Sequence, residues 1–167
     1  MTRRTGRFHG ILQVDRYREF DPVEFCRMSQ CRIVRQDKRS LALEEIDFSR
    51  VAFESLIESM EGVVRGEKKL ARIKADGRIA LDAAVGQALL EEDGQKILRS
   101  FSRCSDQSVT RFELAGTVLE WGRNRFLISL EEDHYDHSWG WWPNLLSENR
   151  DVWEYVPLLS FPTRRAK

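Results

Sequence analysis

The segment from Val109 to Glu132 constrains the fold most, because apolar side chains fall on both faces of two consecutive extended runs. The apolar positions are Phe112, Leu114, Ala115, Val118 and Leu119, and then, after a turn at Gly122-Arg123-Asn124, Phe126, Ile128 and Leu130. A strand with one face in water is apolar only at every second position, whereas a strand covered on both faces is apolar throughout. This segment therefore predicts a hairpin in the centre of a sheet that helices cover.

Shorter patterns predict the elements before this hairpin. Residues 8–17 alternate as a strand, and Asp21 and Pro22 are typical of a helix start, with Phe20 and Phe25 at the positions of a hydrophobic staple. We expect that helix to end near Gln30. Residues 31–36 and 40–46 are expected to form a hairpin around Asp37-Lys38, and residues 71–75 and 79–81 a second hairpin around Asp76-Gly77. A helix that ends at Gly66 is expected between these hairpins, with an apolar stripe of Phe53, Leu56, Ile57, Met60, Val63 and Val64. A further helix is expected to begin after its cap at Asp82 and to be broken at Asp93-Gly94.

The order of these elements is that of an α+β protein. A loop over 133–150 and a last strand over 153–160 complete the predicted order. No linker rich in glycine, serine or proline divides the 167 residues, and the only alternative boundary lies near Arg65–Lys69. We predict one α+β domain over 1–167, with a mostly antiparallel sheet built from hairpins, two or three packed helices, and flexible basic ends at 1–6 and 163–167.

The charge balance and the number of cysteines exclude several classes of function and of site. The 27 basic and 27 acidic side chains cancel, which argues against binding nucleic acid by overall attraction. No apolar run is long enough to cross a membrane or to form a signal peptide after the basic N-terminus, so we expect a cytoplasmic protein with no membrane partner. Cys26, Cys31 and Cys104 are too few for a disulfide framework or a four-ligand zinc site, and we interpret them as reduced, buried side chains.

A run of acids and imidazoles is one candidate site. Glu131-Glu132-Asp133-His134-Tyr135-Asp136-His137 leaves a buried strand and enters a loop, and imidazole and carboxylate groups suit zinc, manganese or iron. A divalent metal held by His134, Asp136 and His137 would lower the pKa of a bound water, with Glu131 or Asp133 as the base. This is the enzyme alternative, a metal-dependent hydrolase. The other interpretation is a polar loop whose histidines bond to neighbours or water.

The run from His134 to His137 resembles the second half of the HxHxDH motif of the metallo-β-lactamase superfamily. The resemblance covers only these residues. Glu132 stands at the position of the first histidine, and His9 is the only other histidine in the chain, so the later ligand histidines of that family are absent. The chain is also shorter than that fold usually needs. We therefore do not assign the chain to that family.

The basic ends suggest a second alternative, nucleic-acid or nucleotide binding. Arg3, Arg4 and Arg7 could meet Arg164, Arg165 and Lys167 on one face and contact phosphates, although no aromatic stacking motif accompanies them. The R-x-x-x-R of residues 3–7 and the D-x-S of residues 47–49 are similar to fragments of the PilZ domain, which implies cyclic-di-GMP binding by the arginines. Ala52 replaces the glycine of that motif, a helix is expected to follow it, and Arg7 and Asp47 are far apart in sequence.

The most unusual feature is a concentration of aromatic residues near the loop. Trp139, Trp141, Trp142 and Trp153 are four of the five tryptophans, and Tyr135 and Tyr155 accompany them. Each buried indole needs a partner for its N–H group, so these rings cannot easily share the interior. Either the loop folds back and closes one end of the core, or some of the rings stay exposed as anchors for a partner.

We favour a small, non-catalytic, cytoplasmic binding or regulatory protein whose working surface is the loop over 133–153. The partner-binding residues would be Tyr135, Trp139, Trp141, Trp142 and Trp153, with the acidic run at the rim. The expected partner is another protein or a second copy of the chain, nucleic acid is not favoured, and no cofactor is expected. On this interpretation, replacing Trp141 or Trp142 by alanine weakens association and leaves the melting temperature nearly unchanged.

Overall fold

The computed structural model describes residues 3–4, 9–27, 30–54, 56, 58, 61–102, 109–147, 149–151 and 158–161. The predicted central hairpin is confirmed: β8 (Arg111–Trp121) pairs antiparallel with β9 (Asn124–Glu132). The backbone of Gly122 in the turn has a φ of 59°, a conformation that glycine adopts without a steric cost. The neighbours of this hairpin define the main sheet.

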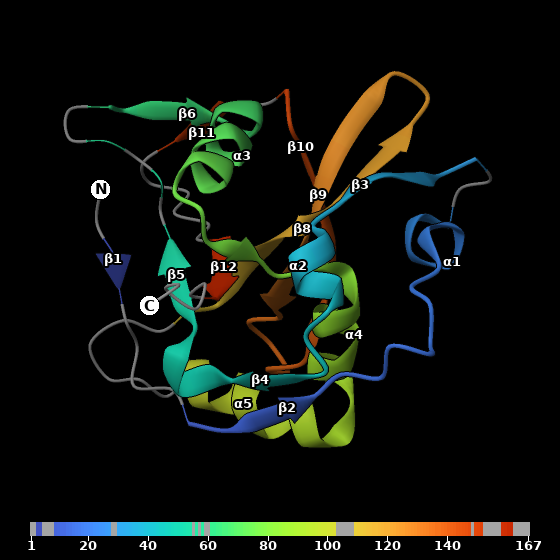
Figure 1. The fold of residues 1–167 in the computed structure, drawn as a ribbon, viewed down its shortest axis with the longest axis vertical. Coiled ribbons are helices and arrows are strands. Elements are labelled where there is room, and N and C mark those ends of the chain that lie inside the picture. Colours follow the sequence, from blue (N-terminus) through green and yellow to red (C-terminus); the bar gives the residue numbers. More distant parts are fainter. Residues whose placement is uncertain are drawn as a thin grey trace.

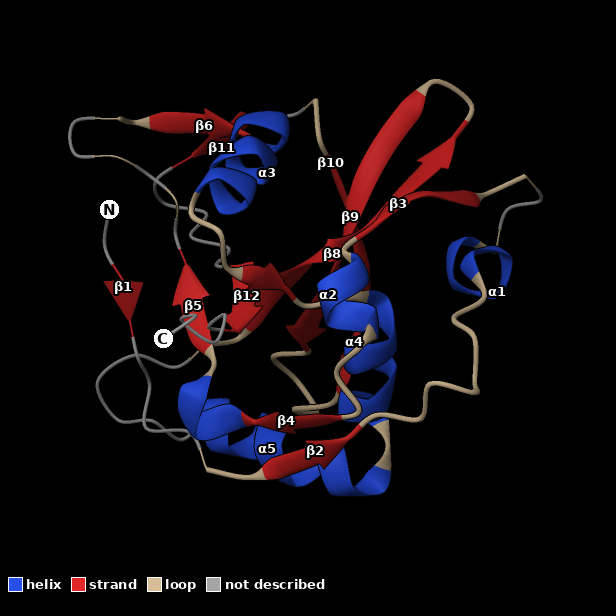
Figure 2. Cartoon of the chain, in the orientation of Figure 1, coloured by secondary structure: helices blue, strands red, loops and turns tan. Residues whose placement is uncertain are grey.

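The main sheet runs in the order β1 (Arg3–Arg4), β5 (Ala52–Glu54), β12 (Leu158–Phe161), β8, β9 and β10 (Trp139–Leu145), with β3 (Arg32–Gln36) also on β8 and β7 (Ile79–Ala80) also on β12. Its pairs are antiparallel except β12 with β8, which is parallel. With the helices that accompany it, this sheet confirms the predicted α+β class (Figures 1 and 2).

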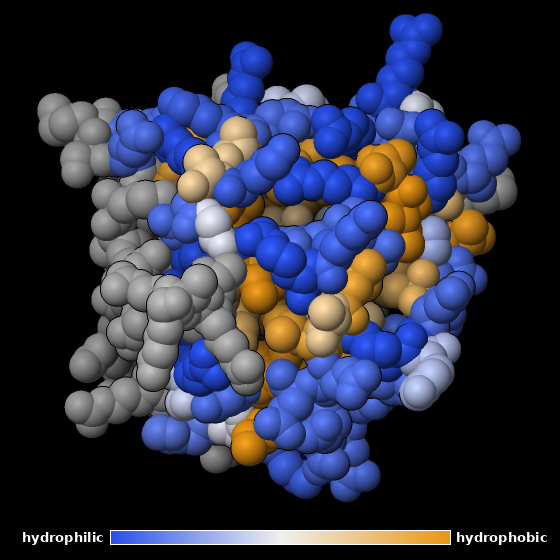
Figure 3. Space-filling model, viewed as in Figure 1, coloured by the Kyte–Doolittle hydropathy of each residue, from blue (hydrophilic) through white to orange (hydrophobic). Residues whose placement is uncertain are grey.

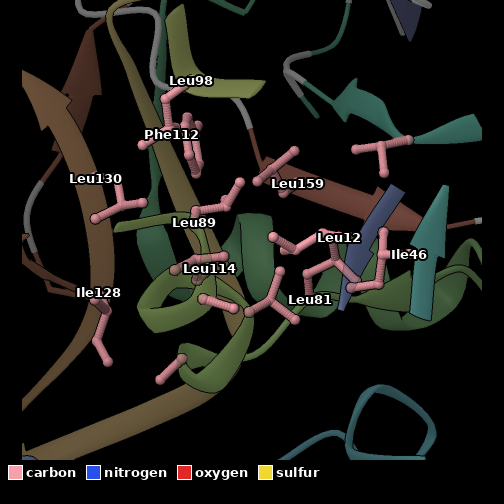
Figure 4. Packing of buried hydrophobic residues seen from close by; sticks show 14 of the residues in the cluster. Leu12, Ile46, Leu81, Leu89, Leu98, Phe112, Leu114, Ile128, Leu130 and Leu159 are labelled. Atoms are coloured by element: carbon pink, nitrogen blue, oxygen red, sulfur yellow. The ribbon is translucent and has the colours of Figure 1, made fainter. Parts of the chain in front are cut away.

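Helices cover both faces of the sheet, as the apolar pattern of β8 and β9 predicts. One face packs against α4 (Ala83–Leu90) and α5 (Glu92–Ser102), and the other against α3 (Gly66–Ala75). The core beside α4 and α5 is drawn in Figure 4 and includes Leu12, Ile46, Leu81, Leu89, Leu98, Phe112, Leu114, Ile128, Leu130 and Leu159. The core beside α3 contains Leu56, Leu70, Ile73, Ala80, Ala115, Val118, Leu127 and Leu146.

The predicted helix over 53–64 is wrong. The chain instead forms a 3-10 turn at Phe48–Arg50, the strand β5, and the strand β6 (Val63–Arg65), which pairs with β11 (Asn149–Asp151). The apolar spacing fitted one helical stripe, but Phe53 belongs to the core beside α4 and α5, and Leu56 to the core beside α3. A single helical face could not reach both cores. Ile57 and Met60 lie outside the described residues.

The predicted hairpin over 71–81 is also wrong, because residues 71–75 end α3. Asp-Gly is typical both of a hairpin turn and of a helix C-terminus. Here Asp76 N donates to Arg72 O, and Gly77 has a φ of 71°. Gly66 was expected to end a helix, but it is the first residue of α3. Because Gly66 has no side chain, its backbone can lie close to Leu146.

Two further elements differ from prediction near residue 37. The Asp37 side chain accepts from Arg39 N and starts the short helix α2 (Lys38–Leu41), so no hairpin forms there. β4 (Glu45–Asp47) pairs with β2 (Ile11–Gln13), while β3 pairs with β8. Figure 1 shows β2 and β4 beside α5 at one end of the view, and α3 beside β6 and β11 at the other.

The helix α1 (Pro22–Cys26) begins as predicted and ends sooner. The Asp21 side chain accepts from Val23 N, and the rings of Phe20 and Phe25 lie 5.8 Å apart between centroids. Arg27 takes a left-handed conformation with a φ of 51°, which ends the helix before Gln30. Similarly, Asp82 caps α4 as predicted, but the break before α5 falls at Glu91 rather than at residues 93–94.

Cys26 and Cys31 form a disulfide across the end of α1, so the interpretation of both as reduced is wrong. The odd total of three cysteines did not indicate that two of them, five residues apart, form a disulfide. Cys104 lies outside the described residues. None of the described helices is both long enough and apolar enough to cross a membrane.

A buried carboxylate joins the N-terminal segment to α2 and α4. Asp82 is almost fully buried, and its carboxylate accepts from Arg16 Nη1 at 3.0 and 3.1 Å and from Ser40 Oγ. Arg16 also donates to the backbone carbonyls of Leu43 and Ser40. A buried charge is tolerated when it is paired and its hydrogen bonds are complete, which this arrangement achieves.

Candidate functional site

The acidic and aromatic run forms a tight β9–β10 hairpin, rather than the loop over 133–150 expected from the sequence. Asp133 N donates to Ser138 O at 2.7 Å, and His137 N donates to Asp133 O at 3.0 Å. His137 takes a left-handed conformation, with a φ of 58°, where the chain turns back into β10. The hairpin places four side chains at its tip, those of His134, Tyr135, Asp136 and His137, and all of them are exposed.

The tryptophans of β10 have different surroundings because successive side chains on a strand point to opposite faces. Trp139 is buried, with 7% of its surface exposed, and packs against Phe101 of α5 and Phe112 of β8. Its indole Nε1 has no hydrogen-bond partner among the described residues. Trp139 is therefore part of the core and is not available as an anchor in this structure.

Trp141 points to the same face as Trp139 and is half-buried. Its ring lies 5.8 Å from that of Phe20 and 5.5 Å from that of Phe25, in edge-to-face arrangements. It also lies against α4 at Gly86, where an added Cβ would come within 2.6 Å of the indole. Trp141 thus joins α1 and α4 to the sheet while keeping part of its ring at the surface.

Trp142 points to the opposite face, and 54% of its surface is exposed. Tyr135, at the hairpin tip, is 98% exposed. These are two of the few large rings that the described part of the chain leaves in water. Trp153, the fifth predicted partner-binding residue, lies outside the described residues, as does Tyr155. The sequence left open whether these rings close one end of the core or stay exposed. Trp139 is buried in the core, and Trp142 is exposed.

Two hollows meet at Trp141. The larger, of about 890 Å³, lies between α1 and α4; its lining includes the apolar side chains Phe20, Phe25, Leu90 and Trp141 and the charged side chains Arg18, Asp21, Glu24, Arg27 and Glu91. The smaller, of about 320 Å³, lies at the β9–β10 hairpin and is lined by Glu131, Glu132, Asp133, His134, Tyr135, Ser138, Gly140, Trp141 and Trp142. The described lining of the smaller hollow is acidic and aromatic.

The carboxylates of the hairpin bond mainly to their own neighbours. Asp133 accepts from Tyr135 N at 2.7 Å, and Glu132 Oε1 lies 3.2 Å from His137 Nδ1. The hydroxyl and the backbone N–H of Ser138 hold the pKa of Asp136 below its ordinary value. Within the described ranges, no three histidine, cysteine, aspartate or glutamate side chains are placed to hold a metal ion. The structure thus gives no geometric support to a metal held by His134, Asp136 and His137.

A buried polar cluster on the face beside α3 was not predicted from the sequence. Lys69 of α3 and Glu113 of β8 are both buried, with Nζ and Oε2 2.5 Å apart. Arg111 Nη2 donates to Asn144 Oδ1, and Arg111 Nε lies 3.4 Å from Glu131 Oε2, while Asn144 Nδ2 is buried without a hydrogen-bond partner in the described part of the chain. A charged residue between Phe112 and Leu114, in a strand covered on both faces, was the available signal.

The basic arms are described only in part. Arg3 and Arg4 form β1, which pairs with Glu54 and Phe53 of β5. Asp47 caps the 3-10 turn through Ser49, and the strand β5 follows where a helix was expected. Arg7, Arg164, Arg165 and Lys167 lie outside the described residues, so the structure does not place the proposed phosphate-binding side chains together.

No protein-family model matches the chain, and neither the curated proteins nor the solved structures contain a significant match to it. What this surface can bind must therefore be argued from its own chemistry.

Proposed function

We propose that this chain is a small, non-catalytic binding or regulatory protein that recognises another protein through the end of its β9–β10 hairpin. We call this the hairpin surface and define it by Glu131, Asp133, Tyr135, Trp141 and Trp142. The observation that carries the proposal is the exposure of Tyr135 and Trp142 beside the 320 Å³ hollow. Tyrosine and tryptophan contribute disproportionately to protein interfaces because they bury a large rigid area and carry a polar tip.

The neighbouring contacts make the hairpin surface firm enough to bind without large rearrangement. Trp141 is fixed by Phe20, Phe25 and α4, and the hairpin turn is closed by the two backbone hydrogen bonds between Asp133 and residues 137 and 138. A preorganised surface loses less conformational entropy on binding than a disordered one. The surface therefore has both exposed rings and a rigid support.

The size of the smaller hollow indicates what can enter it. Sites for whole small molecules and cofactors have volumes of roughly 300–1,000 Å³ and enclose most of their ligand. At about 320 Å³ this hollow is at the lower limit of that range, and because it is open to solvent it would enclose little of a cofactor, so it suits one long side chain of a partner better. His134, Asp136 and His137 stay a sequence prediction for metal binding, and no observed arrangement favours it as a second function.

The test compares two exposed tryptophans, Trp142 on β10 and Trp121 at the turn between β8 and β9. Peptides are selected against the wild-type protein from a displayed library of short random sequences, and their affinities are measured by fluorescence polarisation. We expect Trp142→Ala to weaken the selected peptides at least about tenfold, or 1.4 kcal/mol, without lowering the melting temperature. Trp121→Ala, at a ring that is 41% exposed but outside the hairpin surface, should leave the affinities unchanged.

Two results would contradict the proposal. One is that no peptide is enriched by the wild-type protein over an unrelated control protein. The other is that the enriched peptides bind Trp142→Ala and Tyr135→Ala as tightly as they bind the wild type.

A further inference from the structure

We propose that the partner binds as an added β-strand: a basic, extended peptide segment pairs with the outer edge of β10 and places a lysine or arginine side chain in the hollow of the hairpin surface. This inference rests on the proposed function and adds the binding mode and the chemistry of the partner. The steps that support it are the open edge, the direction of its backbone groups, and the local charge.

β10 is an edge strand. In the described part of the chain it pairs with β9 alone and stands last in the order of the main sheet. Gly140, Trp142 and Pro143 in this strand are exposed. An exposed strand edge presents unpaired N–H and C=O groups, which another extended chain can satisfy.

The register shows which backbone groups point outward. Hydrogen-bonded pairs alternate with non-hydrogen-bonded pairs along an antiparallel ladder. Ser138 bonds with Asp133, and Leu146 bonds with Arg125, at the two ends of the β9–β10 register. The even-numbered residues of β10 therefore face β9 with their backbone groups, and the odd-numbered residues face away. Trp139 and Trp141 thus direct their N–H groups outward.

Pro143 is consistent with this assignment. Proline has no backbone N–H group, so within a sheet it is confined to positions whose N–H group is not needed by the neighbouring strand. As an odd-numbered residue, Pro143 costs no bond to β9. It does remove one donor from the outer edge, so an added strand must bond chiefly to Trp139 and Trp141, at the end of β10 nearer the hollow.

The hollow itself lies at this edge. Gly140 and Trp142 line it from the face beside α3, and Trp141 lines it from the face beside α4. The hollow therefore adjoins the part of β10 that carries the outward N–H groups of Trp139 and Trp141. Trp141 also lines the larger hollow, so an added strand can direct apolar side chains toward Phe20 and Phe25.

Local charge selects a basic occupant. Residues 131–142 contain four carboxylates and no lysine or arginine, although the whole chain has a net charge of zero. Arg111 of β8 pairs with one of these carboxylates, that of Glu131, with Nε and Oε2 3.4 Å apart, and negative charge stays in excess at the hairpin surface. A cation beside Trp142 and Tyr135 would also interact with the faces of their rings. A second copy of the chain fits poorly, because pairing β10 with its own copy around Gly140 would bring two acidic hairpins together.

The probe is a synthetic, end-capped peptide of alternating lysine and valine, compared with the same peptide carrying glutamate in place of lysine. Backbone amide hydrogen exchange is followed residue by residue by NMR. We expect the lysine peptide to slow exchange at Trp139 and Trp141 at least about tenfold. Gly140 and Trp142, which already face β9, should change little. Binding should weaken as salt rises and should be at least about tenfold weaker for the glutamate peptide.

A matched variant separates charge from shape. Asp133→Asn keeps the side-chain volume and an oxygen that can accept from Tyr135 N, and it removes one charge from the lining of the hollow. It should weaken the lysine peptide at least about fivefold while leaving the melting temperature unchanged. A lysine peptide with N-methylated backbone nitrogens facing β10 keeps its charge and should also bind weakly if strand pairing is required.

The outcomes distinguish this inference from the proposed function. Binding that needs Trp142 but leaves the amides of Trp139 and Trp141 unprotected, or that ignores peptide charge, overturns strand addition and leaves the proposed function standing. Protection of these amides without peptide, together with a dimer in light scattering, identifies a second copy as the occupant and overturns the basic partner. Peptide binding that is as tight to Trp142→Ala as to the wild type overturns both proposals.

Discussion

Trp141 shows how one residue can connect the fold to the surface. Its ring closes an edge-to-face group with Phe20 and Phe25, and it fits against α4 only because residue 86 has no side chain. The sequence predicted that replacing Trp141 would leave the melting temperature unchanged. Its packing now assigns it a structural role as well, so Trp142 is the variant that reports on binding alone.

At the same scale, Glu61 gives the chain a defined acid sensitivity. Hydrogen bonds from Arg72 and Lys68 lower the pKa of Glu61 from 4.5 to about 2. A carboxyl group with a lowered pKa in the folded state stabilises that state above its unfolded pKa, and the contribution is lost as pH falls through the folded value.

We therefore expect Glu61→Gln to lower the free energy of unfolding at pH 7, with a difference from wild type that shrinks as pH falls from 4.5 toward 2. Denaturant unfolding at a series of pH values measures this difference. Glu19→Gln, at an exposed side chain, is the control for the removal of one surface carboxylate. A Glu61→Gln deficit that is equal at both ends of the range would contradict the assigned pKa.

At the scale of elements, long regular patterns were predictable and short mixed ones were not. The hairpin of β8 and β9 was recognised because apolar residues continue through both strands. The segment over 53–64 was misread because Phe53 and Leu56 enter two different cores, and no local spacing reveals that. Asp76-Gly77 was misread because one dipeptide suits two structures, and the helix before it decides which one forms.

The ion pair between α3 and β8 offers a test of how the second face of the sheet is held. Removing one partner of a buried ion pair leaves an uncompensated charge and costs about 3–5 kcal/mol, whereas apolar replacement of both is often far less costly. Lys69→Met and Glu113→Leu should each destabilise the protein by about that amount, and the double variant should be more stable than either.

Chemical denaturation of the four proteins in this double-mutant cycle measures the coupling. A double variant whose loss equals the sum of the single losses would show that the two charges do not depend on each other. The buried pair would then not be what fixes α3 to the sheet.

On the scale of the whole molecule, charge balance conceals a strongly uneven surface. Opposite charges cancel over the chain, and many of them are paired, as in the contact of Arg16 with Asp82 that joins the N-terminal segment to α4. At the end of the β9–β10 hairpin the carboxylates are in excess, because residues 131–142 hold four of them and no lysine or arginine, and Arg111 pairs with Glu131 alone. In Figure 3, hydrophilic residues form most of the coloured rim of this face, and hydrophobic residues show in its middle.

The candidate site was predictable from sequence in composition but not in geometry. The density of rings and acids at 131–142 marks the surface, yet nothing in the spacing showed that 139–145 is a strand. Once it is a strand, alternation alone sends Trp139 inward and Trp142 outward. The burial of Lys69 and Asn144 depends on contacts with segments that are distant in sequence, so the residues next to each of them did not predict it.

One NMR titration tests the central claim most directly, because each tryptophan carries an indole N–H that reports on its own surroundings. A peptide selected by the wild-type protein is added, and the indole signals are assigned by single substitutions. The hairpin surface predicts that the signals of Trp141 and Trp142 shift in proportion to occupancy while that of Trp121 stays in place. A shift at Trp121 with none at Trp142 would place the binding surface elsewhere and contradict the account.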